Sequence, residues 1–427
     1  MMTLVKADGK TEYELLERLA ARNGETDRKV TAAVSDILAA VRERGDEAVV
    51  EYTRRFDGVD GPLTCVERER LGELAAACEP RLMEALRRAA ANIEDFHRRQ
   101  VQQSWLTARE DGTILGQRIR GLERVGLYVP GGTAAYPSSV LMNAIPARIA
   151  GVKELIMVTP PPKNGGFNAA VMAAAYIAGV DRVYLCGGAQ AVAALAYGTA
   201  TIPKVDKIVG PGNIYVATAK RLLFGQVDID MIAGPSEILV LADKTADPAY
   251  LAADLMSQAE HDVLASAILL TDSEEIAQET LAQIEKQITA LSREKIIRRS
   301  LEDYGVVIVC RDMEEAVAFA NRLAPEHLEV MCDQPMEYIG RLDNAGSVFL
   351  GKYSPEPLGD YFAGPNHVLP TSGTARFFSP LSVDSFVKKS SFISYNQKAL
   401  EAAREDIIAI AMAEGLDAHA NSITVRA

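Results

Sequence analysis

The chain has 427 residues, 48% of them hydrophobic and 24% charged, which is typical of a soluble globular protein with room for two or three domains. Its net charge of −13 argues against nucleic-acid binding, because no basic face could follow a phosphate backbone. Residues 1–10 are polar and no stretch approaches 18 uninterrupted apolar residues, so we expect a cytoplasmic protein without a membrane span.

The first hundred residues have a helical pattern. Thr26 and Asp27 precede one apolar-periodic run, and Pro80 opens a second run over residues 81–103. His97 lies in the second run beside two arginines, so we expect its side chain to be solvated.

From about residue 114, short runs rich in β-branched residues alternate with helical stretches. The predicted strands of a first series are 155–158, 183–186 and 207–209. The predicted elements of a second series are strands 238–241, 266–271, 306–310 and 328–331, helices 248–260 and 313–323, and a long helix from residue 273. Two such series predict two α/β domains with parallel sheets, joined rigidly near Gly234. A last helix is predicted at 398–413, followed by polar coil.

Three glycine-containing turns follow strands of the first series. They are Pro130-Gly131-Gly132, Gly187-Gly188-Ala189-Gln190 and Gly210-Pro211-Gly212-Asn213. The third approaches the dinucleotide fingerprint, but Tyr215 stands where the last glycine should be, and a plain strand-to-helix turn explains it equally well. Three turns at one sheet edge nevertheless indicate a loosely held nucleotide. The chain has no phosphate-binding loop of the Gly-x4-Gly-Lys-Ser/Thr type, so phosphoryl transfer is not supported.

Four of the five histidines have a carboxylate or carboxamide within a few positions, which suits metal coordination or general base catalysis: His261, His327, His367 and His419. Gln258 and His261 are three apart at the end of a predicted helix and leave the same face. Asp360 and His419 could complete a cage of nitrogen and oxygen ligands for zinc or a similar ion. From the pattern alone, a hydrogen-bonded structural role explains any single histidine more simply.

Glu326 and His327 follow a helix that Pro325 ends, and they precede a strand. Successive strand residues point to opposite faces, so the pair can serve one site only if the turn is irregular. The alternative is that His327 packs inward and Glu326 is solvated.

With these segments identified, the chain resembles the histidinol dehydrogenases, the zinc enzymes of the last step of histidine biosynthesis, from about residue 25 to its end. The motifs that carry the resemblance are Gly126-Leu127-Tyr128-Val129-Pro130-Gly131-Gly132, Cys186-Gly187-Gly188-Ala189-Gln190-Ala191, Val209-Gly210-Pro211-Gly212-Asn213, Ile232-Ala233-Gly234-Pro235-Ser236-Glu237, Gln258-Ala259-Glu260-His261-Asp262, Ala324-Pro325-Glu326-His327-Leu328-Glu329, and Gly359-Asp360-Tyr361 with Gly364-Pro365-Asn366-His367.

The resemblance implies oxidation of L-histidinol to L-histidine through L-histidinaldehyde, with two NAD+ reduced, and it assigns residues to four roles. One zinc ion per subunit would be held by Gln258, His261, Asp360 and His419. The acid–base pair would be Glu326 and His327. Substrate would contact these zinc ligands together with Ser236, His327, His367 and Glu414, and Ser138 and Glu356 are further candidates. NAD would contact Tyr128, Gln190 and Asn213.

The resemblance also implies an α/β fold of two incomplete Rossmann-like, aldehyde-dehydrogenase-like domains, with small helical extensions exchanged in a homodimer. The expected division is an N-terminal arm (1–24), a catalytic and zinc-binding domain (25–127 with 238–381), an NAD-binding domain (128–237) and a tail that reaches the partner subunit (382–427). Glu414 and His419 would then serve the partner's site.

Three other functions stay open at this point. A relative could oxidise another diol, such as a sulfonated propanediol, although Glu356 and Glu414 suit an ammonium group better than an anion. A thiol-dependent aldehyde dehydrogenase could use Cys186, although the five cysteines contain no Cys-x-x-Cys pair and we expect them to be reduced, partly buried thiols. A metal-binding oligomer without catalysis is the third.

Overall fold

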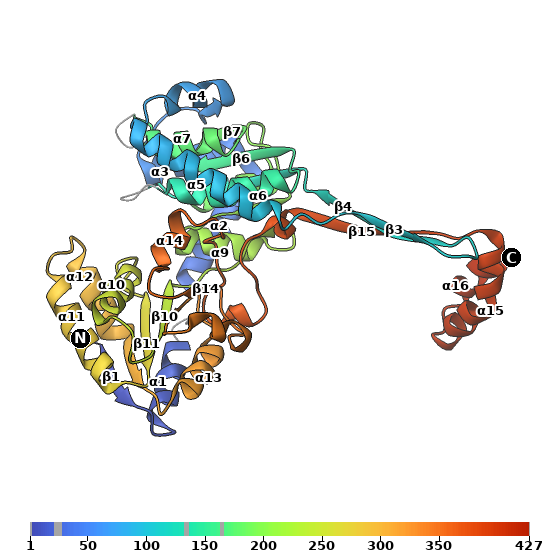
Figure 1. Ribbon diagram of the computed structural model, residues 1–427. Helices are drawn as coiled ribbons and strands as arrows, with labels where there is room; N and C mark the ends of the chain where they lie inside the picture. The colour runs from blue at the N-terminus through green and yellow to red at the C-terminus, as the bar shows by residue number, and fades with distance from the viewer. Residues whose placement is uncertain (1, 21–27, 132–135, 163–165, 427) are drawn as a thin grey trace.

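The computed structural model describes residues 2–20, 28–131, 136–162 and 166–426. Figure 1 shows two α/β lobes and a long arm that projects away from both and ends in helices. Gly132, Thr26 and Asp27, used above in a predicted turn and a predicted helix start, lie outside these ranges. No helix within the described ranges is long and apolar enough to cross a membrane.

The first lobe is built on a six-stranded sheet in which all neighbouring strands are parallel. Its spatial order is β1 (Thr3–Lys6), β12 (Gly305–Val309), β11 (Ser266–Thr271), β10 (Glu237–Ala242), β13 (His327–Met331) and β14 (Ser347–Leu350). One face packs on α10 (Pro248–Ala259), α11 (Glu274–Ile288) and α12 (Glu294–Tyr304), and the other on α1 (Thr11–Ala20) and α13 (Met313–Leu323). The short α14 (Glu356–Tyr361) follows β14.

The second lobe has a six-stranded sheet that is parallel except at one edge. Its order is β2 (Cys65–Glu67), β7 (Arg182–Leu185), β6 (Glu154–Thr159), β5 (Arg124–Tyr128), β8 (Lys207–Val209) and β9 (Asp228–Ile229), with β2 antiparallel. One face packs on α4 (Arg68–Ala75), α5 (Pro80–Arg98), α6 (Pro137–Ile149) and α7 (Ala169–Ile177). The other face packs on α2 (Arg28–Arg44), α3 (Asp46–Asp57), α8 (Gly188–Tyr197) and α9 (Ile214–Leu223).

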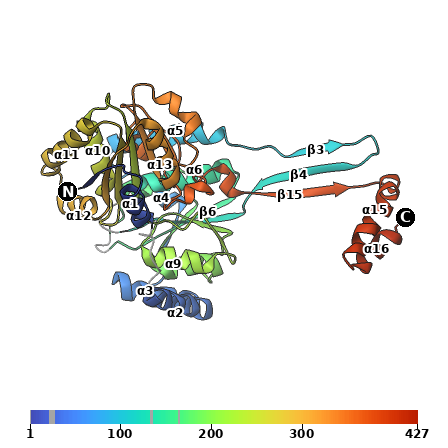
Figure 2. The same cartoon turned by 90° about the horizontal axis from the view of Figure 1, so that it is seen from below.

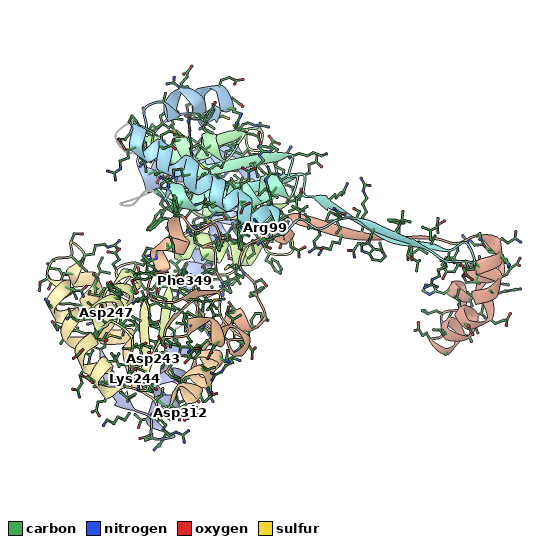
Figure 3. All side chains as sticks on the ribbon, in the orientation of Figure 1. Arg99, Asp243, Lys244, Asp247, Asp312 and Phe349 are labelled. Carbon is green, nitrogen blue, oxygen red and sulfur yellow. The ribbon has the colours of Figure 1, made fainter. Side chains whose placement is uncertain are left out.

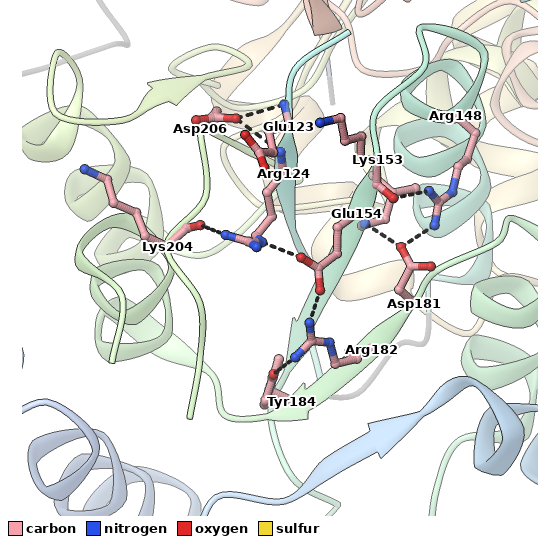
Figure 4. A network of polar contacts seen from close by, with 11 residues as sticks. Glu123, Arg124, Arg148, Lys153, Glu154, Asp181, Arg182, Tyr184, Lys204 and Asp206 are labelled. Carbon is pink, nitrogen blue, oxygen red and sulfur yellow. Dashed lines mark hydrogen bonds and ion pairs between the residues drawn. The ribbon is translucent and has the colours of Figure 1, made fainter. Parts of the chain in front are cut away.

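A polar network fixes the amino ends of the central strands of this second sheet (Figure 4). Glu154 of β6 pairs with Arg124 of β5 on one side and with Arg182 of β7 on the other. Asp181 accepts hydrogen bonds from the Leu155 amide at 2.7 Å and from the Arg148 guanidinium. Because these bonds engage three adjacent strands at one end, they set the strand register and leave the carboxyl ends free to form a ligand site.

The projecting arm is a three-stranded antiparallel sheet with two terminal helices. Its strands lie in the order β15 (Val387–Ser394), β4 (Ile114–Gly121) and β3 (Trp105–Ala108), and the chain ends in α15 (Gln397–Ala413) and α16 (Asp417–Thr424). Figures 1 and 2 show from two directions that the terminal helices lie far from both lobes. Several large apolar side chains of the arm are more than half exposed: Trp105, Leu106, Ile393, Ile410 and Met412.

Both α/β units expected from the sequence are present, and the structure adds detail that the sequence pattern missed. β1 and β2 are too short to show an alternating pattern, the long helix from residue 273 is two helices, and the expected terminal coil contains α16. β4 and β15 form the arm although no strand was predicted there.

The division into domains also differs from the expected one. Residues 2–20 are not a separate arm, because β1 pairs with β12 and Leu16 lies in the core of the first lobe. Residues 28–98 pack on the second sheet and not with the lobe that carries β10 and β13. An amphipathic helix shows in its sequence that one face is buried, but not against which sheet.

His97 is fully buried, so the expectation that it is solvated was wrong. Its Nδ1 donates to the Ile93 carbonyl at 2.9 Å, and the Asn366 amide lies 3.4 Å from its Nε2. Burial lowers the pKa of His97. The ring therefore packs as a neutral group that ties α5 to the chain segment after α14.

Candidate active site

Glu326 and His327 lie side by side at the amino end of β13, where α13 ends in an irregular turn. Ala324 has a left-handed φ of 51° and Pro325 follows it, so the chain enters the strand at an angle. Glu326 Oε2 accepts the Glu237 amide at 2.9 Å, and His327 Nδ1 donates to the Glu237 carbonyl at 2.9 Å. Both side chains thus bind one residue of β10 and face one site. The irregular turn meets the condition under which two successive residues can do so.

The bond to Glu237 also fixes the ring of His327. Because Nδ1 carries the hydrogen that the carbonyl accepts, Nε2 is the bare nitrogen of the neutral ring. Nε2 is buried and has no hydrogen-bond partner among the described residues. It lies 3.9 Å from Glu356 Oε1 and 3.9 Å from Asp360 Oδ1. This nitrogen is therefore available to a metal, a substrate or a proton.

Three side chains at this point can approach one cation. His327, Glu356 and Asp360 each offer a ligand atom, and these atoms lie within 4.8 Å of one another. Gln258, at the end of α10, is fully buried, and neither polar atom of its amide has a partner among the described residues. A buried, unpaired amide is costly unless something binds it. The nitrogen and oxygen donors gathered here fit a divalent cation such as zinc.

The remaining predicted substrate residues of this lobe surround that group. His261, on the exposed turn after α10, is close enough to His327 and His367 to help depress the pKa of both. His367 Nδ1 donates to the Asp360 carbonyl at 3.1 Å, and its Nε2 lies 3.3 Å from the hydroxyl of Ser139 on α6. Ser139 is buried. Its neighbour Ser138, a candidate for contact with substrate, is half-buried in the first turn of the same helix. Ser236 is half-buried directly before β10.

The candidate site faces the second lobe. It occupies the amino ends of β10 and β13, and Phe349 of β14 lies beside His327 with ring centroids 6.1 Å apart. Figure 3 places Phe349 on the side toward the second lobe and Asp243 and Asp312, which follow β10 and β12, at the opposite end. Asn366 donates to the Met142 carbonyl of α6 at 2.6 Å, so the segment after α14 docks on the second lobe and closes the site from that side.

Burial sets the protonation of the central groups. It raises the pKa of Glu326 well above the ordinary value, with the Glu237 amide opposing the rise. It also raises the pKa of Glu356 to about 9, with the nearby Asp360 carboxylate adding to the rise. Burial lowers the pKa of His327, against the attraction of Asp360. His327 is therefore neutral near pH 7, the form in which it can accept a proton.

The predicted NAD residues lie at the carboxyl edge of the second sheet. The Tyr128 hydroxyl accepts the Gly188 amide at 3.1 Å, and a Cβ at Gly210 would lie 2.1 Å from the Tyr128 carbonyl oxygen. Gln190 is buried, and neither polar atom of its amide has a hydrogen-bond partner among the residues that the structure describes. Asn213 is exposed and caps α9 through its side-chain oxygen. These turns pack on one another. They place the side-chain amide of Gln190 and backbone N–H groups at the carboxyl edge of the second sheet.

Glu414 and His419 lie elsewhere in this chain. Glu414 follows α15 and His419 lies in α16, both exposed at the end of the arm (Figure 1). The arm carries them away from Gln258 and Asp360, so one chain does not bring all four predicted metal ligands together.

Comparison with known proteins agrees with this geometry. The histidinol dehydrogenase family profile matches residues 20–427. A protein named histidinol dehydrogenase from Geobacillus kaustophilus (strain HTA426) is 59% identical over 394 residues, covering 92% of this chain and 93% of its own length. One from Listeria innocua serovar 6a is 55% identical over 418 residues, covering 98% of both chains. The chain belongs to the histidinol dehydrogenase family. The crystal structure of histidinol dehydrogenase from Elizabethkingia anophelis superposes with a TM-score of 0.93 at 39% identity, covering 100% of this chain and 98% of that one.

The family is by name one of oxidoreductases. The burial of Cys186 argues against its use as a nucleophile. The thiol is fully buried, and burial raises its pKa far above the ordinary value. All five cysteines are free, as expected from the sequence.

Sequence reasoning missed a buried ion pair that holds the Gly210 turn, one of the three turns predicted to contact a nucleotide. The Lys220 ammonium donates to the Gly210 carbonyl at 2.9 Å and pairs with Asp230, whose other oxygen accepts the Gly210 amide at 2.8 Å. Both side chains are at most 6% exposed. The sequence contained one sign of this ion pair: Lys220 occupies a position of α9 at which the helical periodicity predicts a buried apolar residue.

Replacing Lys220 by methionine should destabilise the protein by about 3–5 kcal/mol, because Asp230 would be left charged and buried. It should also raise the KM for NAD, because the Gly210 turn loses one of its two anchors. Lys207→Met is the matched control, since Lys207 pairs with a half-exposed Asp228 and its loss should cost about 1 kcal/mol or less. Chemical unfolding and NAD titration measure both effects, and equal losses in the two variants would contradict this account.

Proposed function

We propose that the protein is a zinc- and NAD-dependent histidinol dehydrogenase that oxidises L-histidinol to L-histidine through L-histidinaldehyde, with two NAD+ reduced. The observation that carries the proposal is one cluster: His327 with a bare Nε2, Glu326 beside it, and the carboxyl groups of Asp360 and Glu356 within reach of that nitrogen. The names of the similar proteins support the substrate.

Zinc would be held by Gln258, His261 and Asp360 of one chain and by His419 of a second chain. Bound there, it would supply open coordination positions for the imidazole and amino nitrogens of the substrate and so orient the alcohol carbon. Glu356 and His367 lie next to these ligands and would contact the substrate together with Ser236 and Glu414. Carboxylates suit the ammonium group of an amino alcohol and disfavour a sulfonated substrate.

The proton chemistry follows from the two side chains on β13. In the first oxidation His327 Nε2 takes the alcohol proton as a hydride leaves the carbon for NAD. In the second, Glu326 takes a proton from the water that adds to the aldehyde, while the protonated His327 returns its proton to the aldehyde oxygen. The hydrate that results then gives a hydroxyl proton to the neutral His327 as the second hydride leaves for a second NAD. A neutral His327 can accept the alcohol proton, and the raised pKa of Glu326 makes its carboxylate a stronger base once the proton has left.

NAD would lie over the carboxyl edge of the second sheet, in contact with Tyr128, Gln190 and Asn213. The unpartnered Gln190 amide supports this placement, since a ligand would satisfy it. An apolar cavity of about 220 Å³ lies beside the turns after β6 and β7 and is lined by Leu63, Pro162 and Phe167 among others. Its apolar walls suit the adenine ring.

The arm would complete the site of a partner subunit in a homodimer. The arm exposes large apolar side chains, and contact with a second chain would bury them. Exchange of the arms would bring His419 and Glu414 to the partner's Gln258–Asp360 cluster.

Two measurements test this function. We expect two NADH per histidinol consumed, because both oxidations occur in one site. A strong chelator should abolish turnover and added zinc should restore it, and His261→Asn should behave like the chelated protein because it removes a ligand. One NADH per substrate, or full turnover in a demonstrably metal-free sample, would contradict the proposal. Histidinol-independent zinc binding without any NADH would instead favour a non-catalytic role.

A further inference from the structure

The chain crosses from the first lobe to the second directly after α14 and then returns. α14 lies against α10 of the first lobe. Phe362 and Val368 pack on the hydrophobic core of the second lobe. Ser372 is back on the first lobe, where its amide donates to Glu237 Oε2 at 3.2 Å. Residues 362–368, which we call the clasp, are therefore a loop of the first lobe that is seated on the second.

Contacts with α5 seat the first half of the clasp. Asn92 of α5 donates from its side-chain amide to the Phe362 carbonyl at 2.8 Å, and the guanidinium of Arg88 lies 5.3 Å from the centre of the Phe362 ring. Gly364 has a φ of 116°, and a Cβ there would lie 2.6 Å from the Asn92 carbonyl oxygen. Because glycine has no Cβ, it permits this approach, and the clasp lies directly on the backbone of α5.

A proline in α6 provides the acceptor for the second half of the clasp. Pro146 lies within α6 and has no N–H, so the carbonyl four residues before it, that of Met142, receives no hydrogen bond from it. The side-chain amide of Asn366 donates to this carbonyl at 2.6 Å, and its oxygen accepts the Val368 amide at 2.9 Å. The same amide nitrogen lies 3.4 Å from His97 Nε2. Asn366 thus satisfies a carbonyl that the proline leaves open inside a buried helix.

Two residues of the candidate site lie on either side of this crossing. Asp360 lies in α14 on the first lobe, whereas His367 lies in the clasp, with its Nε2 3.3 Å from the Ser139 hydroxyl of α6. α6 follows the first of the three turns predicted to contact a nucleotide. Hydride transfer needs reacting atoms about 3–3.5 Å apart, and a misplacement of about 1 Å can cost about 10²-fold in rate. The clasp is the segment through which the spacing of the lobes reaches a predicted substrate residue.

We infer that Asn366 and Asn92 are positioning residues: by seating the clasp on α5 and α6 they fix His367, and with it the substrate, relative to the cofactor on the second lobe. They act through the backbone of the clasp and not by touching the reacting groups. The inference rests on the proposed function for the identity of substrate and cofactor, whereas the seating of the clasp does not depend on it.

Two variants each remove one anchor of the clasp. Asn366→Ser separates the bond to α6 from the turn inside the clasp, because a serine hydroxyl can still accept the Val368 amide two residues on but is too short to reach the Met142 carbonyl. Asn92→Ala removes the bond to the Phe362 carbonyl and leaves the sequence of the clasp unchanged.

The matched control is Gln287→Ala, which removes a bond of the same kind from within the first lobe. The Gln287 amide donates to a backbone carbonyl of another helix, that of Ala249, at 3.0 Å. Ala249 lies at the opposite end of α10 from Gln258. All three variants lose one bond from an amide to a carbonyl, so all three should be somewhat less stable than the wild type. A clasp that served stability alone would have no further effect.

The first readout is hydrogen exchange of the backbone amides of residues 362–368 in the protein without substrate. Loss of either anchor should raise their exchange rate about 10-fold or more, because the clasp opens more often. Asn92→Ala is the decisive case, since its lesion lies outside the clasp. Gln287→Ala should leave exchange at the wild-type rate. Wild-type exchange of the clasp in both anchor variants would overturn the seating by these two side chains.

The second readout is kcat together with the primary isotope effect of histidinol that carries deuterium at the reacting carbon. A displaced substrate slows hydride transfer relative to the other steps, so kcat should fall about 10- to 100-fold in Asn366→Ser, and less in Asn92→Ala, while the isotope effect on kcat rises. Zinc content and the KM for NAD should stay at wild-type values. Gln287→Ala should change neither kcat nor the isotope effect. Wild-type values of both in the two anchor variants would overturn the positioning role.

The two readouts separate this inference from the proposed function. If the wild type forms no NADH from histidinol, the proposed function fails, and hydrogen exchange still decides whether Asn92 and Asn366 seat the clasp. If Asn366→Ser does not fold, Asn92→Ala, in which the replaced side chain is only half-buried, decides both readouts.

Discussion

Replacing His327 by asparagine should slow both oxidations by about 10²–10⁴-fold, the usual contribution of a general base. The asparagine amide can still donate to the Glu237 carbonyl, which His327 Nδ1 reaches at 2.9 Å, so the turn at the amino end of β13 should keep its shape. What is lost is the bare Nε2. Because the alcohol proton and the hydrate proton both leave to this atom, neither step is spared.

Glu326→Gln should give a different pattern. The glutamine oxygen can still accept the Glu237 amide, which Glu326 Oε2 accepts at 2.9 Å, but the side chain no longer takes a proton from water. Water enters only at the aldehyde, so the first hydride transfer should be faster than the second in this variant. Single-turnover measurements starting from histidinol and from histidinaldehyde separate the two steps. Full activity of Glu326→Gln on the aldehyde would refute the water-activating role.

The pKa of Glu326 predicts a pH dependence for the same step. Burial raises that pKa, so the carboxylate that accepts the proton forms only as pH rises, and the aldehyde step should accelerate with pH. Stability has the opposite sign: the folded state holds a proton that the unfolded chain releases above its ordinary pKa, so this contribution is lost as pH rises through the raised value. In Glu326→Gln both trends should weaken together.

Much of the site could be predicted from the sequence because its residues interrupt regular patterns. The order of strands and helices followed from periodicity, and Pro325 marked the turn that carries Glu326 and His327. Family motifs then added Asp360 and His367, which lie far from β13 in the chain but within reach of it in space.

The rest depends on contacts between remote segments. Nothing in the sequence of residues 114–121 or 387–394 indicates that they pair over their whole length and form an arm. The contact between Ser139 and His367 joins α6 to the segment after α14, and no motif indicated it.

The position of the arm leads to the largest change in activity that the proposed function predicts, a recovery of activity when two inactive variants are mixed. His419 lies in α16 at its end, and His327 lies in β13 of the first lobe, so exchange of arms would assemble each site from two chains. His327→Asn and His419→Asn should each be inactive alone. Unfolded together, mixed and refolded, they should recover about a quarter of the wild-type sites, because random mixing makes about half the dimers hetero and each heterodimer has one site with both lesions and one with neither.

Mixing His327→Asn with Glu326→Gln is the matched control for that recovery. Both lesions lie on β13 or directly before it, within 3.6 Å of each other, so every site of every heterodimer carries one of them whether or not arms are exchanged. This mixture should show no gain over its parents, while the His419 mixture should. Differently tagged chains report that heterodimers have formed. If the tags show well-folded heterodimers and the His419 mixture still gains nothing, each site is built within one chain, and the arm must then reach its own lobe by a movement that this conformation does not display; the roles of Glu326 and His327 would stand unchanged.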